Sequence, residues 1–197
     1  MSYIDKSTPT DHTIHPIIKN RWSPREFSDT AVEQQHVNQI LEAGRWAPSS
    51  YNRQPWTIIY GHKGDGVYER IFSCLDEFNQ GWAVNAPLLM VAAYKKDDEN
   101  GNENFHALHD LGAFSMSMSL QAQDLNIAMH QMAGIDFNAA RGEFGLPDNY
   151  HVATGIAAGY YGGDVSDLNE KLQEQETSER KRKPITRFAF NGNFTNA

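Results

Sequence analysis

The feature that most constrains the fold is an apolar run, APLLMVAAY, at residues 86–94. A continuous apolar run of this kind, followed by polar residues, is typical of a strand buried inside a sheet. Residues 56–60 and 151–162 combine β-branched, aromatic and small side chains and are also predicted to be strands. The segment ITRFAF, at residues 185–190, is expected to form a last short strand.

Helical spacing of apolar residues occurs between these strands. Helices are expected over residues 14–20, 30–44, 67–78, 103–125 and 136–145, and over the polar stretch that follows residue 166. Thr30 and Glu33 match a capping box, and Asp136 is a predicted N-cap. Strands and helices are mixed without a regular βαβ rhythm, which favours the α+β class.

The predicted helix at residues 103–125 carries small residues along much of its length, including Gly112, Ala113 and Ser115. Small residues let a helix approach its neighbours closely, so this helix is expected to lie centrally. Leu108, with Leu111 and others, is expected to point inward.

Length and composition indicate one domain spanning residues 1–197, with terminal extensions at 1–13 and 189–197. Apolar runs are too short to span a bilayer, and the first residues lack the apolar core of a secretory signal. The single cysteine, Cys74, cannot form an internal disulfide, so a cytoplasmic location is expected. The net charge of -8 argues against nucleic acid as a partner.

Two basic clusters stand out against this acidic background. RWSPREF places Arg21, Ser23 and Arg25 on a loop, and guanidinium groups with a hydroxyl are suited to holding a phosphate. The second cluster is ERKRKP, at residues 179–184. Each cluster alone favours a solvated surface, and the second is also compatible with a nucleic-acid patch or a localisation tail. A further interpretation is that both clusters converge on one anion.

A third motif, APSSYNRQPW, lies between a predicted helix and a predicted strand. Its Ser49, Ser50, Asn52 and Gln54 offer donors and acceptors on a loop, where binding groups are common. Pro, Ser and Asn also occur in ordinary turns, so this stretch alone leaves both interpretations open.

The order of the motifs resembles the nitroreductase family of FMN-dependent oxidoreductases. RWSPREF is followed by AGRWAPSSYNRQPW, then NAPLLMVAAY, then GYYG, then a basic segment ending at Pro184. The resemblance runs from about residue 14 to about residue 188. It implies a central, mostly antiparallel sheet flanked by helices, and an intertwined homodimer with FMN sites at the subunit interface.

The resemblance assigns cofactor-binding roles residue by residue. Arg21, Trp22, Ser23 and Arg25 match the first FMN motif, in which Arg21 and Ser23 would hold the phosphate and Arg25 would reach the pyrimidine edge of the flavin. Pro48, Ser49, Ser50 and Asn52 match a loop that approaches the flavin from the partner subunit. The remaining matches are Asn79 beside the pyrimidine, Met132, Ala133 and Gly134 on the N5 side, and Arg180 and Arg182 at the phosphate.

Two positions depart from the pattern of many relatives. Ala133 stands where an acidic residue commonly precedes the glycine matched by Gly134, and Trp82 stands where some relatives carry a lysine. The pocket wall is therefore expected to be less polar, and more of the electrostatic tuning of the flavin falls on Arg25.

The implied activity is hydride transfer from NAD(P)H, through FMN, to a planar electron-poor acceptor such as a nitroarene, quinone or enone, by a ping-pong mechanism. No side-chain nucleophile or general base is required, because the flavin performs the chemistry. The alternatives are a relative that remodels its flavin and a non-enzymatic anion-binding or nucleic-acid-binding protein. No metal site is expected: His106 and Asp110 share a helical face, but no third ligand follows at a recognisable spacing.

Overall fold

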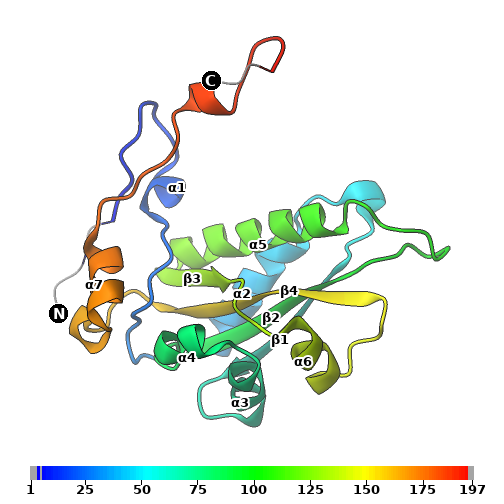
Figure 1. Ribbon diagram of the computed structural model, residues 1–197, viewed down its shortest axis with the longest axis horizontal. Helices are drawn as coiled ribbons and strands as arrows, with labels where there is room; N and C mark the ends of the chain where they lie inside the picture. Colours follow the sequence, from blue (N-terminus) through cyan, green and yellow to red (C-terminus); the bar gives the residue numbers. More distant parts are fainter. Residues whose placement is uncertain (1–3, 5, 195–197) are drawn as a thin grey trace.

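The computed structural model describes residue 4 and residues 6–194. Its centre is one four-stranded antiparallel sheet in the order β1-β2-β4-β3 (Figure 1). The strands are β1 (Trp56–His62), β2 (Leu88–Lys95), β3 (Ile127–Met132) and β4 (Tyr150–Tyr160). The α+β class and the antiparallel sheet predicted from the sequence are therefore confirmed.

The apolar run forms β2, which lies between β1 and β4. Its first six residues are buried, because helices cover both faces of the sheet. Small residues in β4 face large ones in β2: Val91 pairs with Gly155, and Leu89 pairs with Ala157. A register shift between Ala92 and Ala93 lengthens β4 relative to its partner.

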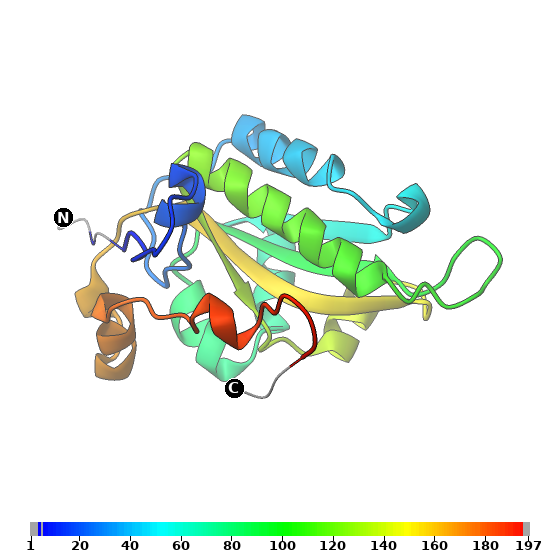
Figure 2. The ribbon, with the colours of Figure 1, turned by 90° about the horizontal axis from the view of Figure 1, so that it is seen from above.

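Two helices, α2 (Gln34–Arg45) and α5 (Ala107–Asp124), cover one face of the sheet (Figures 1 and 2). Their contact is close at Gly44, where an added Cβ would lie 2.7 Å from the ring of Phe114. The other face carries α3 (Gly66–Ser73), α4 (Glu77–Ala83) and α6 (Phe137–Glu143). Each face packs its own apolar cluster, so the sheet is the shared wall of two cores.

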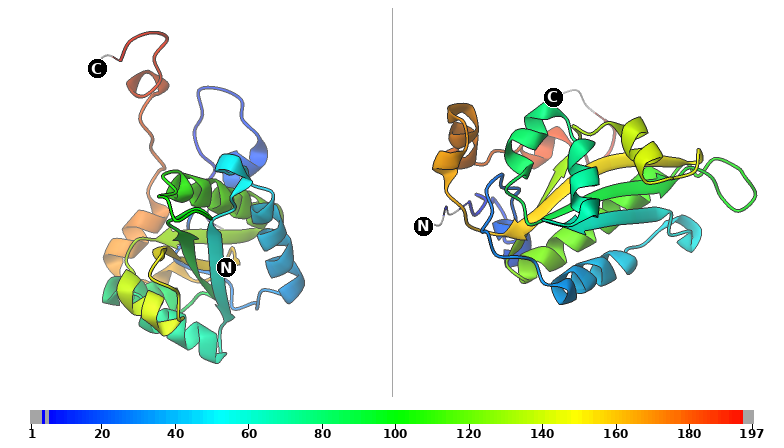
Figure 3. Two further views of the ribbon diagram at one scale, coloured as in Figure 1. Left: turned by 90° about the vertical axis from the view of Figure 1, so that its right-hand side faces the viewer. Right: turned by 90° about the horizontal axis from the view of Figure 1, so that it is seen from below.

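The remaining elements lie outside this sandwich. They are α1 (Pro16–Asn20), α7 (Glu170–Thr177) and three short 3-10 helices at Ser50–Asn52, Val165–Asp167 and Ile185–Arg187. The chain after α7 rises beside the N-terminal segment and away from the sheet (Figures 1 and 3). We call residues 178–194 the C-terminal arm.

Several predictions about the helices need correction. Thr30 does not cap a helix: α2 begins at Gln34, and its N-cap Glu33 makes no side-chain capping bond. Residues 67–78 do not form one helix, because Asp76 caps α4 by accepting from Asn79 N and so starts a new helix after a turn. Leu108 is 57% exposed rather than inward. Asp136 does cap α6, as predicted.

Two predictions about strands were also wrong or incomplete. Residues 127–132 were not predicted as a strand, yet they form β3 at the sheet edge. Residues 185–190 were predicted as a strand, but they contain the 3-10 helix Ile185–Arg187 and pair with no strand within the described chain. The β-branched and aromatic residues of this segment cannot hold a strand there because no partner edge supplies its hydrogen bonds within the described chain.

Candidate functional site

The two basic clusters meet at one hollow of about 320 Å³ beside α7. Arg21, Trp22, Ser23 and Arg25 reach it from the N-terminal loop, and Arg180 and Arg182 reach it from the C-terminal arm. Lys6 lines it as well. The lining carries six cationic side chains and two carboxylates, so this concave surface is arranged for an anion.

Contacts within the hollow fix its cations in place. Arg21 Nη1 donates to Ser23 Oγ at 3.3 Å, and Arg180 Nη1 donates to the backbone oxygens of Lys6 at 2.8 Å and Lys19 at 3.2 Å. Lys6 Nζ donates to the backbone oxygen of Ser178. Burial lowers the pKa of Arg180, and the charges of Arg21 and Arg182 lower it further. Mutual repulsion of this kind is relieved when an anion binds between the cations.

Trp22 forms part of the wall of the hollow. Its ring stacks on Tyr161 at 6.1 Å, and Lys6 Nζ lies 5.5 Å from its ring centre. The Trp22 backbone N donates to the Tyr161 hydroxyl at 3.4 Å. The motif is thereby anchored to the end of β4.

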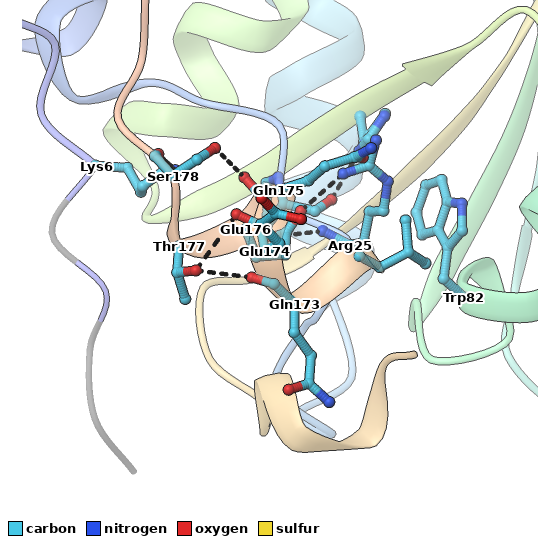
Figure 4. Close-up of polar contacts among 12 residues, drawn as sticks. Lys6, Arg25, Trp82, Gln173, Glu174, Gln175, Glu176, Thr177 and Ser178 are labelled. Atoms are coloured by element: carbon cyan, nitrogen blue, oxygen red, sulfur yellow. Dashed lines mark hydrogen bonds and ion pairs between the residues drawn. The ribbon is translucent and has the colours of Figure 1, made fainter. Parts of the chain in front are cut away.

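Arg25 lines the hollow and lies between Glu176 of α7 and Trp82 of α4 (Figure 4). Its Nη1 donates to Glu176 Oε1 at 2.9 Å, and its guanidinium carbon lies 6.0 Å from the Trp82 ring centre. Among the described residues, the buried Nε of Arg25 has no hydrogen-bond partner. A buried donor without a partner is costly, so this N–H is available to an acceptor on a ligand.

Asn79, Trp82 and Gly134 form a connected group behind Arg25. Asn79 Nδ2 donates to the Gly134 oxygen at 3.0 Å, and Trp82 Nε1 donates to Asn79 Oδ1 at 3.1 Å. Met132 is buried at the end of β3, and Ala133 is exposed in the turn that follows. The structure therefore joins Asn79 to the Met132–Gly134 turn, two segments far apart in the chain.

His130 packs against this group from β3. Its ring centre lies 4.6 Å from that of Trp82, and its Nδ1 lies 2.8 Å from the Pro24 oxygen. Burial lowers the pKa of His130 to about 4, with smaller contributions from the charges of Arg25 and Arg21. A neutral imidazole therefore adds no further charge to this cation-rich region at neutral pH.

The loop Pro48, Ser49, Ser50 and Asn52 lies apart from the hollow, at the other end of the sheet (Figures 2 and 3). Ser50 N donates to the buried Asp110 carboxylate at 3.0 Å, which ties the loop to α5. Tyr51 and Asn52 have φ of 52° and 55°, an uncommon conformation for residues other than glycine. Within one chain, the structure brings the two basic clusters to one hollow and joins Asn79 to Gly134, whereas this loop lies apart from the hollow.

Sequence reasoning missed two charged residues of the hollow. Glu176 is buried although its neighbours in α7 are mostly exposed, and the one available signal was its i,i+4 spacing from Leu172, which is also buried. Lys6 lies in a segment that the sequence analysis set aside as a terminal extension. No local pattern distinguishes it from a solvated lysine.

Glu26, a buried residue of the RWSPREF motif, is expected to make the stability of the protein depend on pH. Burial is the main cause that raises the pKa of Glu26 to about 7, and neighbouring carboxylates add to the rise. A pKa raised on folding favours the folded state below the unfolded pKa of about 4.5 and loses that contribution as pH rises through 7. Gln at this position can still accept the 3.0 Å bond that Asn85 Nδ2 donates to Glu26 Oε1.

We therefore expect Glu26→Gln to increase the free energy of unfolding, relative to wild type, by about 2 to 3 kcal/mol more at pH 8 than at pH 5. Urea denaturation at the two pH values measures this difference. Glu174→Gln, an exposed change of the same chemistry, is the control. An equal effect of Glu26→Gln at both pH values would show that Glu26 titrates normally.

No helix among the described residues is both long and apolar enough to cross a bilayer. Nor do the described residues contain a group of three or more His, Cys, Asp or Glu side chains placed to hold a metal ion. His106 and Asp110 instead lie beside the Pro48–Asn52 loop.

Comparison with known proteins gives the family and related structures. A family model described as "Nitroreductase family" matches residues 18–73 and 63–160. A crystal structure of an FMN-containing oxidoreductase is 32% identical, with a TM-score of 0.91 and 98% of each chain covered.

Two named relatives match over shorter stretches. A Streptomyces coelicolor protein named for NADH dehydrogenase and NAD(P)H nitroreductase is 37% identical over 67 residues, 34% of this chain and 33% of that protein. The nitrobenzene nitroreductase of Ectopseudomonas oleovorans is 44% identical over 48 residues, 24% of this chain and 21% of that protein. Both matches span less than two thirds of the relative's own length.

Proposed function

The chain belongs to the nitroreductase family, and we propose that it is an FMN-dependent oxidoreductase that takes hydride from NAD(P)H and passes it to a planar electron-poor acceptor. The observation that carries the proposal is the convergence of guanidinium groups from both ends of the chain on one hollow. The relative that covers 98% of this chain, at 32% identity, contains FMN, which supports the choice of anion.

The residues present suit a flavin mononucleotide. Arg21, Ser23, Arg180 and Arg182 offer charged and hydroxyl donors for the phosphate dianion. Arg25 lies further inside, and its unpaired Nε–H suits a ring oxygen or nitrogen on the pyrimidine edge. The turn Met132, Ala133 and Gly134 would border the N5 side of the ring.

Bound FMN would supply the hydride chemistry, which leaves the protein to bind, orient and tune. Arg25 would favour negative charge at the pyrimidine edge, and Asn79 is held in place by Gly134 and Trp82. No side chain needs to act as a nucleophile. NAD(P)H and the acceptor would occupy the same open face in turn, so steady-state kinetics should give parallel double-reciprocal lines, and intersecting lines would contradict this order.

The active form in this proposal is a homodimer with its FMN sites at the subunit interface. The Pro48–Asn52 loop lies at the far end of the sheet from the hollow of its own chain, so a second copy would have to bring it there. The C-terminal arm also carries apolar side chains with little cover: Ile185 is 49% exposed, Phe188 65% and Phe194 74%. A second copy would bury them.

The decisive experiment for the cofactor is anaerobic spectroscopy of the purified protein. We expect the visible flavin bands, their loss on adding NADH or NADPH, and their return on adding a quinone or nitroarene. Protein that neither carries nor takes up FMN would overturn the proposal. Salt-dependent binding of nucleic acid by such flavin-free protein would support the non-enzymatic alternative.

Removing the arm tests the dimer. A chain that ends at Lys183 keeps Arg180 and Arg182 but loses Ile185, Phe188 and Phe194. Burial of three such side chains is worth several kcal/mol, so we expect the dimer dissociation constant to rise at least about 100-fold. Light scattering across a dilution series measures it, and an unchanged dimer population would show that the arm does not join the subunits.

A further inference from the structure

We propose that Glu176 is a positioning residue, which holds Arg25 in place and limits the positive charge that Arg25 presents to the flavin ring. This inference rests on the proposed function, because it concerns the end of the hollow assigned to the ring. It adds a residue that no motif in the sequence indicates.

The Glu176 carboxylate accepts two hydrogen bonds from Arg25 (Figure 4). Its Oε1 accepts from Arg25 Nη1 at 2.9 Å, and its Oε2 accepts from the Arg25 backbone N at 3.1 Å. One carboxylate therefore fixes both the backbone and the side chain of Arg25, across 151 residues of sequence.

The surroundings leave this pair little freedom. The side chain of Glu176 is 2% exposed and that of Arg25 is 19% exposed. Leu172, one turn earlier in α7, is buried and anchors the helix against the body. Trp82 lies near the Arg25 guanidinium on another side, at 6.0 Å. Arg25 is thus held between α7 and α4 before any ligand binds, which is how an enzyme preorganises a charge.

The arginines of the hollow differ in how far their charge is cancelled. An ionised Glu176 cancels much of the charge of Arg25 where the ring would lie. Arg21, Arg180 and Arg182, which would hold the phosphate, donate instead to a hydroxyl and to backbone oxygens. Affinity for FMN is then set mainly at the phosphate end. The balance between oxidised and reduced flavin, which differ in charge at the ring, is set mainly by Arg25 and Glu176.

Burial raises the pKa of Glu176, and the contacts with Arg25 and the charge of Lys6 oppose that rise. The test is therefore run at pH 8, because a higher pH favours the ionised carboxylate. Glu176→Gln removes the charge and retains one acceptor for Arg25 Nη1. Glu174→Gln makes the same chemical change at an exposed position on the same helix and is the matched control.

The readout is the reduction potential of bound FMN, measured by equilibration with reference dyes, together with the dissociation constant of oxidised FMN. With Glu176→Gln, we expect reduced FMN to be favoured over oxidised FMN about tenfold more than in wild type. For a two-electron couple this is a shift of about +30 mV. Glu174→Gln should leave the potential unchanged. An equal potential in both variants would overturn the inference.

A double-mutant cycle tests whether Glu176 acts through Arg25. In an Arg25→Gln background, Glu176 loses contacts that oppose the rise of its pKa on burial, so its charged form is less favoured. Glu176→Gln should then shift the potential much less than it does in wild type. An undiminished shift would show that Glu176 acts on the flavin by another route. Wild-type protein that binds no FMN would overturn the proposed function itself. If wild type and both Glu variants bind FMN with the same reduction potential, only the role of Glu176 is overturned.

If Glu176→Gln does not fold, Glu176→Asp takes its place. Aspartate keeps the charge but is one methylene shorter, so it cannot reach both donors of Arg25. We then expect FMN to dissociate from Glu176→Asp several-fold faster than from wild type. Its reduction potential should shift by less than half of the 30 mV predicted for the loss of charge. An unchanged rate of FMN dissociation would show that the hydrogen bonds between Glu176 and Arg25 have no positioning role.

Discussion

Alanine at position 21 is expected to raise the dissociation constant for FMN by between about 10-fold and 100-fold, with little loss of stability. The loss corresponds to one charge-assisted hydrogen bond to the phosphate. Within the described chain, the Arg21 side chain donates to Ser23, which itself lines the hollow. Titration of apoprotein with FMN, followed by flavin fluorescence, measures the effect.

Riboflavin makes this experiment specific, because it has the same ring as FMN but no phosphate. Arg21→Ala should leave riboflavin affinity within about twofold of wild type, whereas Arg25→Ala should weaken both ligands. Arg45→Ala is the matched control, since Arg45 is an exposed arginine that pairs with Glu42 away from the hollow. Equal losses of FMN and riboflavin in Arg21→Ala would show that Arg21 does not contact the phosphate.

The parts of the fold that could be predicted from the sequence are those determined by local patterns. The apolar run of β2 indicates a buried strand, and Asp136 caps α6 because its side chain accepts from Asn138 N and Ala139 N. β3 escaped prediction because its residues IAMHQM include a polar pair at His130 and Gln131. His130 is satisfied by tertiary contacts with Pro24 and Trp82, and no local pattern reveals these.

The same division applies to the site. The types and order of Arg21, Ser23, Arg180 and Arg182 suggested an anion site, and the structure brings these residues to one hollow. Their assignment to a flavin phosphate stays a prediction. Glu176 was not predictable, because a glutamate in a polar helix is ordinarily solvated and its role arises from a contact 151 residues away.

The terminal segments show why local composition alone is insufficient. The residues ITRFAF include β-branched and aromatic side chains, but the arm that carries them rises away from the sheet and pairs with no strand edge within the described chain (Figure 3). Lys6, by contrast, looked like part of a free extension and yet joins the hollow through the backbone of Ser178. The conformation of residues 185–190 and the position of Lys6 both depend on the surfaces that tertiary folding brings next to them. The local sequence does not specify those surfaces.

Gly134→Ala is expected to lower the free energy of unfolding by about 2 to 4 kcal/mol, the combined cost of an overpacked site and a disturbed helix cap. A Cβ on Gly134 would lie 2.1 Å from Asp76 Oδ2 and 2.3 Å from Asn79 Nδ2. Asp76 cannot move aside freely, because its Oδ1 caps α4 and its backbone N donates to the Gly134 oxygen at 3.1 Å. The clash must therefore displace Asn79, the cap or the turn itself.

Gly134→Ala should also weaken FMN binding, because the same displacement moves Asn79 and the Met132–Gly134 turn, which is proposed to border the flavin ring. Gly142→Ala is the matched control: its added methyl group would have nothing within 4 Å, and alanine is the better helix former in α6. Urea denaturation and FMN titration of both variants measure the two effects. If Gly134→Ala were as stable as Gly142→Ala, the close approach of α4 to the turn after β3 would not constrain the site. Loss of stability with unchanged FMN affinity would instead confine Gly134 to the fold and remove this turn from the cofactor site.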